Sequence, residues 1–197
     1  MRWLAVDGID GSGKTTHANW IRAYYEERGE KTMIYVHPSS RLMGRLTRRL
    51  LQGSGIVMQA LAGTFFIVDV FGSLRHMKKH SSEYDNVVFV RYLMATAYLP
   101  GRLAKIGYGF FVRLLPVPDR LLLVDIDPGV AFERISARME EKEMFEDISH
   151  LIKTRKKVLS LADGSWKIID NSFSDADSRI QLHQILAYWD SKSQGPR

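Results

Sequence analysis

The segment GIDGSGKT at residues 8–15 constrains this chain more than any other feature of its sequence. It matches the pattern G-x-x-x-x-G-K-[S/T] and lies between an apolar stretch, residues 3–7, and residues 14–27, where apolar side chains recur at helical spacing. The glycines let the backbone bend so that successive N–H groups converge on a phosphate, and the positive end of the helix dipole adds to this attraction. The sequence therefore predicts a strand, a phosphate-binding loop and a helix in succession.

Two side chains of this loop indicate the ligand. Lys14 can reach the β and γ oxygens of ATP, and the Thr15 hydroxyl is suited to bind Mg²⁺. A GTPase would carry an N-K-x-D motif and a motor ATPase an apolar strand ending in Asp-Glu, and we find neither in the sequence. The pattern therefore favours a small ATP-dependent kinase.

Strand and helix patterns alternate along the rest of the chain. Residues 86–90, NVVFV, are almost entirely apolar, as expected for a strand inside a parallel sheet. Further strands are predicted at residues 32–37, 120–126 and 166–170, and helices at 41–51, 59–78, 130–138 and 174–189. With no internal repeat or linker, residues 1–197 are predicted to form one α/β domain with the P-loop NTPase fold. Its mostly parallel sheet should carry helices on both faces.

Composition excludes several other classes of protein. The chain has no cysteine, which excludes disulfides, zinc–thiolate sites and thiol catalysis. Its net charge of +6 permits a nucleic-acid or membrane partner but does not require one. The basic clusters at residues 76–80 (HMKKH) and 153–157 (KTRKK) are expected on solvated helix faces. The sequence has no uninterrupted apolar run of the length a membrane helix needs and no signal peptide, so we expect a cytoplasmic protein.

Arg91 directly follows the apolar strand at residues 86–90. The carboxyl ends of parallel strands border the crevice where ligands bind, so this guanidinium should point toward the phosphate loop. There it can bridge the phosphates of donor and acceptor and stabilise the transferred group. Arg91 is therefore predicted to be catalytic, together with Lys14.

Arg134 and Arg138 are four positions apart on a predicted helix and so share one face. The polar stretch at residues 139–146 follows them. This arrangement is typical of a mobile lid over ATP, here at about residues 138–148. An ordinary helix with ion pairs to Glu133 and Glu140 accounts for the same pattern equally well.

These segments resemble those of the thymidylate kinase family of P-loop nucleoside monophosphate kinases, in the family's order and over nearly the whole chain. The matching segments are AVDGIDGSGKTT at 5–16, HPSSRLMGRLTRRLL at 37–51, FFIVDV at 65–70, VRYLMATAYLPG at 90–101, LLLVDIDPGVAFERISAR at 121–138 and WKIIDNSFS at 166–174.

The resemblance implies roles for individual residues. The donor site would consist of Gly8, Asp10, Gly11, Ser12, Gly13, Lys14, Thr15 and Thr16, with Thr15 on Mg²⁺ and Arg138 reaching in from the lid. The acceptor site would consist of Asp10 at the sugar hydroxyl, Arg48 and Arg91 at the phosphate, Phe66 stacked on the base, and Tyr98. Family members are usually homodimers, and the mostly apolar helix from Gln59 is a candidate interface.

The chain also departs from the family pattern, mostly on the acceptor side. Val90 replaces the D-R-Y aspartate near magnesium, Val70 replaces the arginine that reads the thymine edge, and Ala95 replaces a serine. Residues 36–38 lack the arginine and glutamate of the R-E-P segment, and Tyr98 stands one residue early. Loss of polar groups that read the base should leave an apolar pocket that binds thymine more weakly and accepts other acceptors.

Three functions therefore remain open from the sequence. The first is an ATP-dependent phosphotransferase that passes the γ-phosphate to a nucleoside monophosphate, either dTMP or a related phosphate acceptor. The second is an inactive or weakly active ATP-binding protein that regulates assembly or a partner, which Val90 favours. The third is a nucleic-acid-binding module, suggested only by the net charge.

Overall fold

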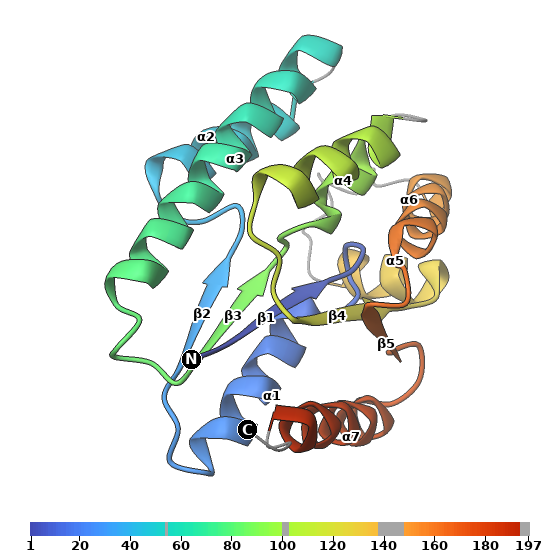
Figure 1. The fold of residues 1–197 in the computed structure, drawn as a ribbon. Coiled ribbons are helices and arrows are strands. Elements are labelled where there is room, and N and C mark those ends of the chain that lie inside the picture. Colours follow the sequence, from blue (N-terminus) through green and yellow to red (C-terminus); the bar gives the residue numbers. More distant parts are fainter. Residues whose placement is uncertain (54, 100–102, 138–147, 194–197) are drawn as a thin grey trace.

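A computed structural model describes residues 1–53, 55–99, 103–137 and 148–193 of the chain, and strands alternate with helices along it (Figure 1). The elements in order are β1 (Arg2–Asp7), α1 (Lys14–Glu26), β2 (Thr32–Val36), α2 (Leu42–Leu51), α3 (Ile56–Lys79), β3 (Asn86–Val90), the short 3₁₀ helix η1 (Met94–Tyr98), α4 (Leu103–Leu114), β4 (Arg120–Asp125), α5 (Pro128–Ser136), α6 (Ile148–Leu161), β5 (Trp166–Asp170) and α7 (Asp175–Ser193).

The five strands form one parallel sheet in the order β2-β3-β1-β4-β5. The central strand β1 pairs with β3 so that Val6 stands opposite Val90, and the Arg91 N–H donates to the Val6 carbonyl at 3.1 Å. The phosphate loop follows β1 and Arg91 follows β3, so both leave the sheet side by side at the carboxyl ends of its strands.

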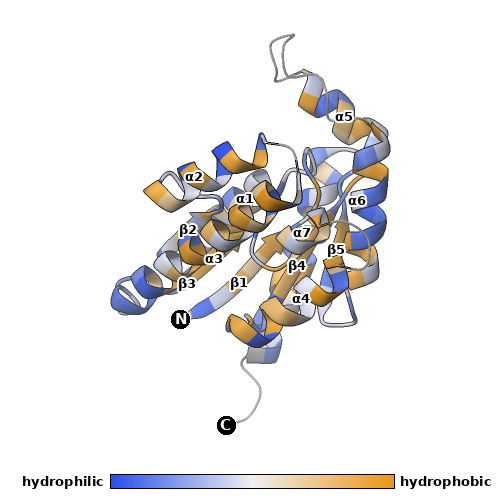
Figure 2. Cartoon of the chain, turned by 90° about the horizontal axis from the view of Figure 1, so that it is seen from above, coloured by the Kyte–Doolittle hydropathy of each residue, from blue (hydrophilic) through white to orange (hydrophobic). Residues whose placement is uncertain are grey.

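Alternate residues of each strand bury their side chains on opposite faces of the sheet. On β1, Leu4 and Val6 pack with α1 and α7, whereas Ala5 packs with residues from α3, α4 and α6. The view in Figure 2 shows the apolar strands enclosed between these helices. Because both faces are covered, the inner residues of the central strands β1, β3 and β4 are apolar, as the sequence predicted for residues 86–90.

The prediction of an α/β fold with a parallel sheet covered on both faces is confirmed. The helix α4 and the 3₁₀ helix η1 were not predicted, and α6 was anticipated only through the helix face expected for residues 153–157. In α4 the sequence LAKIGYGFFVRL contains two glycines, which weaken the local helix propensity. The predicted lid falls on residues 138–147, which lie outside the described part of the chain, and on Ile148, which begins α6.

Helix α3 is apolar on two faces. Phe66 and Val70 are buried in the core, whereas Val57, Leu61 and Phe71 are exposed. By length and average composition, Val57–Lys79 could cross a membrane, although the sequence contains no uninterrupted apolar run of that length. In the structure this helix covers one face of the sheet and contacts α2.

Candidate functional site

The phosphate loop joins the end of β1 to the start of α1, and two of its glycines have left-handed backbone conformations. Gly11 and Gly13 have φ values of 75° and 87°. A Cβ at Gly13 would also lie 2.7 Å from the side-chain nitrogen of Asn171, so only glycine fits there. Within this turn the buried Lys14 ammonium donates to the Ile9 carbonyl at 2.5 Å. Lys14 therefore spans the loop, and its ammonium group has three N–H donors in all.

Asn171 holds the phosphate loop from behind. It follows β5 directly, is buried, and donates its amide N–H to the Ser12 carbonyl at 2.9 Å. Its side-chain oxygen accepts from the Ser178 hydroxyl at 2.6 Å. Sequence reasoning missed this residue, although a polar side chain directly after an apolar strand is a usable signal.

Replacing Asn171 by alanine should weaken ATP binding, because the Ser12 carbonyl loses its partner and the loop its support. We expect KM for ATP to rise more than KM for the acceptor, and the free energy of unfolding to fall by about 1–3 kcal/mol. Steady-state kinetics and urea unfolding measure both quantities. Ser172→Ala is the matched control, since that neighbouring hydroxyl accepts from the Asp127 N–H and does not touch the loop. Equal changes in the two KM values would contradict the assigned role.

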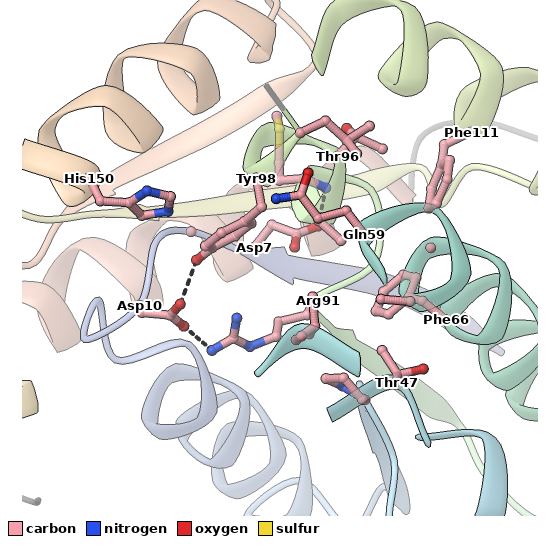
Figure 3. A pocket seen from close by; sticks show the side chains of 18 of the residues that line it. Asp7, Asp10, Thr47, Gln59, Phe66, Arg91, Thr96, Tyr98, Phe111 and His150 are labelled. Atoms are coloured by element: carbon pink, nitrogen blue, oxygen red, sulfur yellow. Dashed lines mark hydrogen bonds and ion pairs between the residues drawn. The ribbon is translucent and has the colours of Figure 1, made fainter. Parts of the chain in front are cut away.

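Arg91, Asp10 and Tyr98 form a cluster beside the loop (Figure 3). The Arg91 guanidinium makes an ion pair with Asp10, and the Tyr98 hydroxyl donates to the other Asp10 oxygen at 2.8 Å. Burial raises the pKa of Asp10, but the charges of Arg91 and Lys14 and the hydrogen bonds outweigh it and lower the pKa to about 2. Asp10 is therefore ionised at neutral pH and fixes the Arg91 guanidinium at the carboxyl ends of the strands.

Arg91 has φ of 59°, which is rare for a residue other than glycine. The carboxylate of Asp7, buried at the end of β1, lies against the residues that follow Arg91 in the chain. Asp7 accepts the backbone N–H groups of Tyr92, Leu93 and Met94 at 3.0–3.3 Å. Burial raises the pKa of Asp7, and these three N–H groups and the Lys14 charge oppose that rise. Asp7 thus holds the turn that aims Arg91.

A cavity of about 330 Å³ opens next to this cluster. Of the residues predicted for the acceptor site, Asp10, Phe66, Arg91 and Tyr98 line it, and Gly8 borders it from the phosphate loop. Sequence reasoning missed several other lining residues, which come from helices whose inward faces it did not assign (Figure 3): Thr47, Gln59, Thr96, Phe111 and His150.

Arg48 lies beside the cavity, next to the lining residue Pro38. Its side chain is exposed and donates to the Pro38 carbonyl at 2.7 Å, and it does not line the cavity. Arg134 lies in the last turn of α5. Burial lowers the pKa of His17 on α1, and the charge of Arg134 contributes to that lowering. Arg138 lies outside the described residues.

The three single-residue replacements, Ala95, Val70 and Val90, occupy different environments. Ala95 lines the cavity, so the replacement of the family's serine removes a hydroxyl from the cavity wall. Val70 is fully buried in the core beside Phe66 and does not line the cavity. Val90 packs on the opposite face of the sheet, among residues of α1. Only Ala95 therefore changes the wall of the pocket directly.

The donor set fits a magnesium ion held mainly by ATP. The Thr15 hydroxyl is exposed in the first turn of α1. The nearby carboxylates already have partners: Asp10 and Asp7 as above, and Asp125 through two hydrogen bonds of 2.7 and 2.8 Å from Arg155. Within the described residues no group of three or more His, Cys, Asp or Glu could hold a metal. One hydroxyl suits Mg²⁺, which keeps several waters and binds through phosphates.

Comparison with known proteins agrees with this geometry. The sequence model of the family described as "Thymidylate kinase" matches residues 6–180. A thymidylate kinase of Leptospira borgpetersenii is 30% identical over 161 residues, which cover 78% of this chain and 77% of that protein. A probable thymidylate kinase of Archaeoglobus fulgidus is 28% identical over 187 residues, or 93% of each chain.

A solved thymidylate kinase structure from Candida albicans has the same fold, with a TM-score of 0.72 and 19% identity over 96% of this chain and 92% of that one. Fold, phosphate loop and sequence relatives agree, and the chain belongs to the thymidylate kinase family, whose members are ATP-dependent nucleoside monophosphate kinases.

Proposed function

We propose that this enzyme transfers the γ-phosphate of ATP to dTMP. The observation that carries the proposal is the placement of Arg91, which Asp10 and Asp7 fix between the phosphate loop and the cavity. A cation there lies next to both the loop, where the donor would bind, and the cavity, where the acceptor phosphate would bind. The names of the sequence relatives support dTMP as the acceptor.

The residues of the chain would divide the work as follows. The loop N–H groups and Lys14 bind the donor phosphates, while Thr15 holds Mg²⁺, which supplies charge neutralisation when bound. Arg91 binds the acceptor phosphate and the transferred group, so that an acceptor oxygen attacks the γ-phosphorus in line as the bond to ADP breaks. Asp10, in addition to aiming Arg91, offers an acceptor to the sugar hydroxyl.

The cavity supports a nucleotide base as its occupant. Phe66 and Phe111 line one side with their rings stacked at 6.2 Å between centroids, which gives a flat apolar surface for a base. The polar side chains of Thr47, Gln59 and Thr96 line the same cavity. These groups can hydrogen-bond a base edge, so recognition of dTMP does not require an arginine at position 70.

The test is release of ADP from Mg²⁺–ATP in the presence of dTMP, dUMP, the other monophosphates and the bare nucleosides. Turnover should be highest with dTMP, and the Lys14→Ala variant serves as the blank. If turnover occurred with another acceptor and not with dTMP, that acceptor would be the substrate in place of dTMP. Bound ATP without turnover on any member of the panel would overturn the proposal in favour of a binding protein.

We infer further that the enzyme is a cytoplasmic homodimer without a nucleic-acid or membrane partner. The exposed Val57, Leu61, Val68 and Phe71 of α3 form an outward apolar face that a second copy can cover. An isologous interface of this kind accounts for the composition of α3 without a membrane. Light scattering at two protein concentrations should give twice the mass of one chain, and a monomer at both would contradict the dimer.

A further inference from the structure

The HMKKH segment lies at the end of α3, which reaches the edge strand β2 (Figure 1), and its two histidines lie face to face. His76 and His80 are one helical turn apart, and their rings are stacked with centroids 4.3 Å apart and an angle of 26° between planes. The cavity and the phosphate loop contain neither residue. The nucleotide chemistry proposed above leaves this pair unexplained.

The Nδ1 atom of each ring lies within hydrogen-bond distance of an oxygen atom. His76 Nδ1 lies 2.7 Å from the Tyr35 hydroxyl, and His80 Nδ1 lies 2.8 Å from a carboxylate oxygen of Glu83. When Nδ1 donates to these oxygens, the lone pair of each ring is on Nε2. Hydrogen bonds from Nδ1 to an oxygen are the usual way in which proteins orient a metal-binding histidine.

The spacing of the rings suits one shared ion. A tetrahedral ion with N–metal bonds of 2.0–2.1 Å holds its two nitrogens about 3.3 Å apart. The stacked rings are 4.3 Å apart at their centroids and inclined by 26°, so the rings are close enough to share an ion but must turn about their side-chain bonds before their Nε2 lone pairs converge on it. Residues at positions i and i+4 of a helix also project from the same face, which keeps both rings within reach of one ion.

We propose that His76 and His80 form a binding site for a divalent transition-metal ion of the Zn²⁺, Ni²⁺ or Cu²⁺ class. Water completes the coordination, and Tyr35 and Glu83 orient the two ligands. Imidazole nitrogen selects these ions over Mg²⁺, so the site does not compete for the metal of the phosphate loop. The positive charge of Lys78 and Lys79 on neighbouring helical positions opposes the ion and makes the site one of moderate affinity.

Binding should also stabilise the fold. His76 contacts Tyr35 of β2, so an ion fixed to His76 and His80 strengthens the connection between α3 and the edge of the sheet. A ligand that binds only the folded chain raises Tm, and the stabilisation grows with the logarithm of its concentration above Kd.

Isothermal titration of the full chain with NiCl₂ tests the site, with no polyhistidine tag and no nucleotide present. We expect one ion per chain, and a loss of at least tenfold in affinity in His76→Gln and in His80→Gln. Glu83→Gln, which removes only the orienting carboxylate, should weaken binding about tenfold. Excess Ni²⁺ should raise the Tm of the wild type and leave that of His76→Gln unchanged.

His183→Gln is the matched control, since it removes one histidine from α7, remote in sequence from the pair. It should bind Ni²⁺ as the wild type does. Equal affinity in the wild type and His76→Gln would overturn the proposal, as would an ion shared between two chains. Circular dichroism spectra identical to that of the wild type confirm that each variant is folded.

Discussion

Replacing Arg91 by alanine is expected to lower kcat about 10³–10⁵-fold, the range measured for arginines that stabilise phosphoryl transfer. The guanidinium is fixed by Asp10 on one side of the cavity, and Asp7 holds the turn behind it. No reorganisation is therefore needed when charge develops on the transferred phosphoryl group. Steady-state kinetics with Mg²⁺–ATP and dTMP measure the change.

Arg91→Lys separates the charge from the geometry. Lysine keeps one positive charge but cannot bridge two phosphates with a planar fork, so we expect only partial recovery of kcat. Binding of ATP alone, measured by titration, should change little in either variant because the loop and Lys14 remain. A kcat within tenfold of the wild type for Arg91→Ala would remove Arg91 from the mechanism.

Acidification should unfold this protein through His37. His37 is buried, stacks on Phe89, and has both ring nitrogens within hydrogen-bond reach of partners, the Val90 carbonyl and the Ser73 hydroxyl. Burial lowers the pKa of His37 from 6.5 to about 4, against the attraction of Asp69. The folded-state pKa lies below the unfolded value, so the stabilisation is complete above pH 6.5 and is lost as pH falls toward 4. The loss should be about 3 kcal/mol across that window.

Urea unfolding at steps from pH 7 to pH 4 measures this slope, and His37→Gln is the control. The glutamine does not titrate, so its stability should fall less steeply over the window even if it is lower at pH 7. Part of the slope should persist, because burial also lowers the pKa of His17. Parallel curves for the wild type and the variant would show that His37 does not carry the acid sensitivity.

Local sequence patterns were sufficient to predict the elements that show a regular hydrophobic pattern or a recognisable motif. The phosphate loop, the five strands and the placement of Arg91 at the cavity follow from spacing and from the properties of parallel sheets. The supporting contacts join distant positions and have no local signal. Asn171 meets Ser12 across 159 positions, and Asp7 meets Leu93 across 86.

The base pocket is the clearest case in which sequence position misled the interpretation. Val70 aligns with a residue that reads the base, yet it is fully buried in the core. The helical phase of α3 decides which side chains face the cavity, and there Gln59, Ala62, Gly63 and Phe66 do so. An alignment assigns a position along the helix, whereas the direction of each side chain depends on packing against the sheet and α2.

The single carboxylate of Asp7 has a mechanical consequence. It joins the end of β1 to the segment after β3, and so ties the phosphate loop to the turn that carries Arg91. In the proposed mechanism, the groups that bind the two reacting phosphates therefore hold their relative positions before either substrate arrives. The adjustment to acceptors of different size falls to the other wall of the cavity, where α2 and α3 supply Thr47, Gln59 and Phe66.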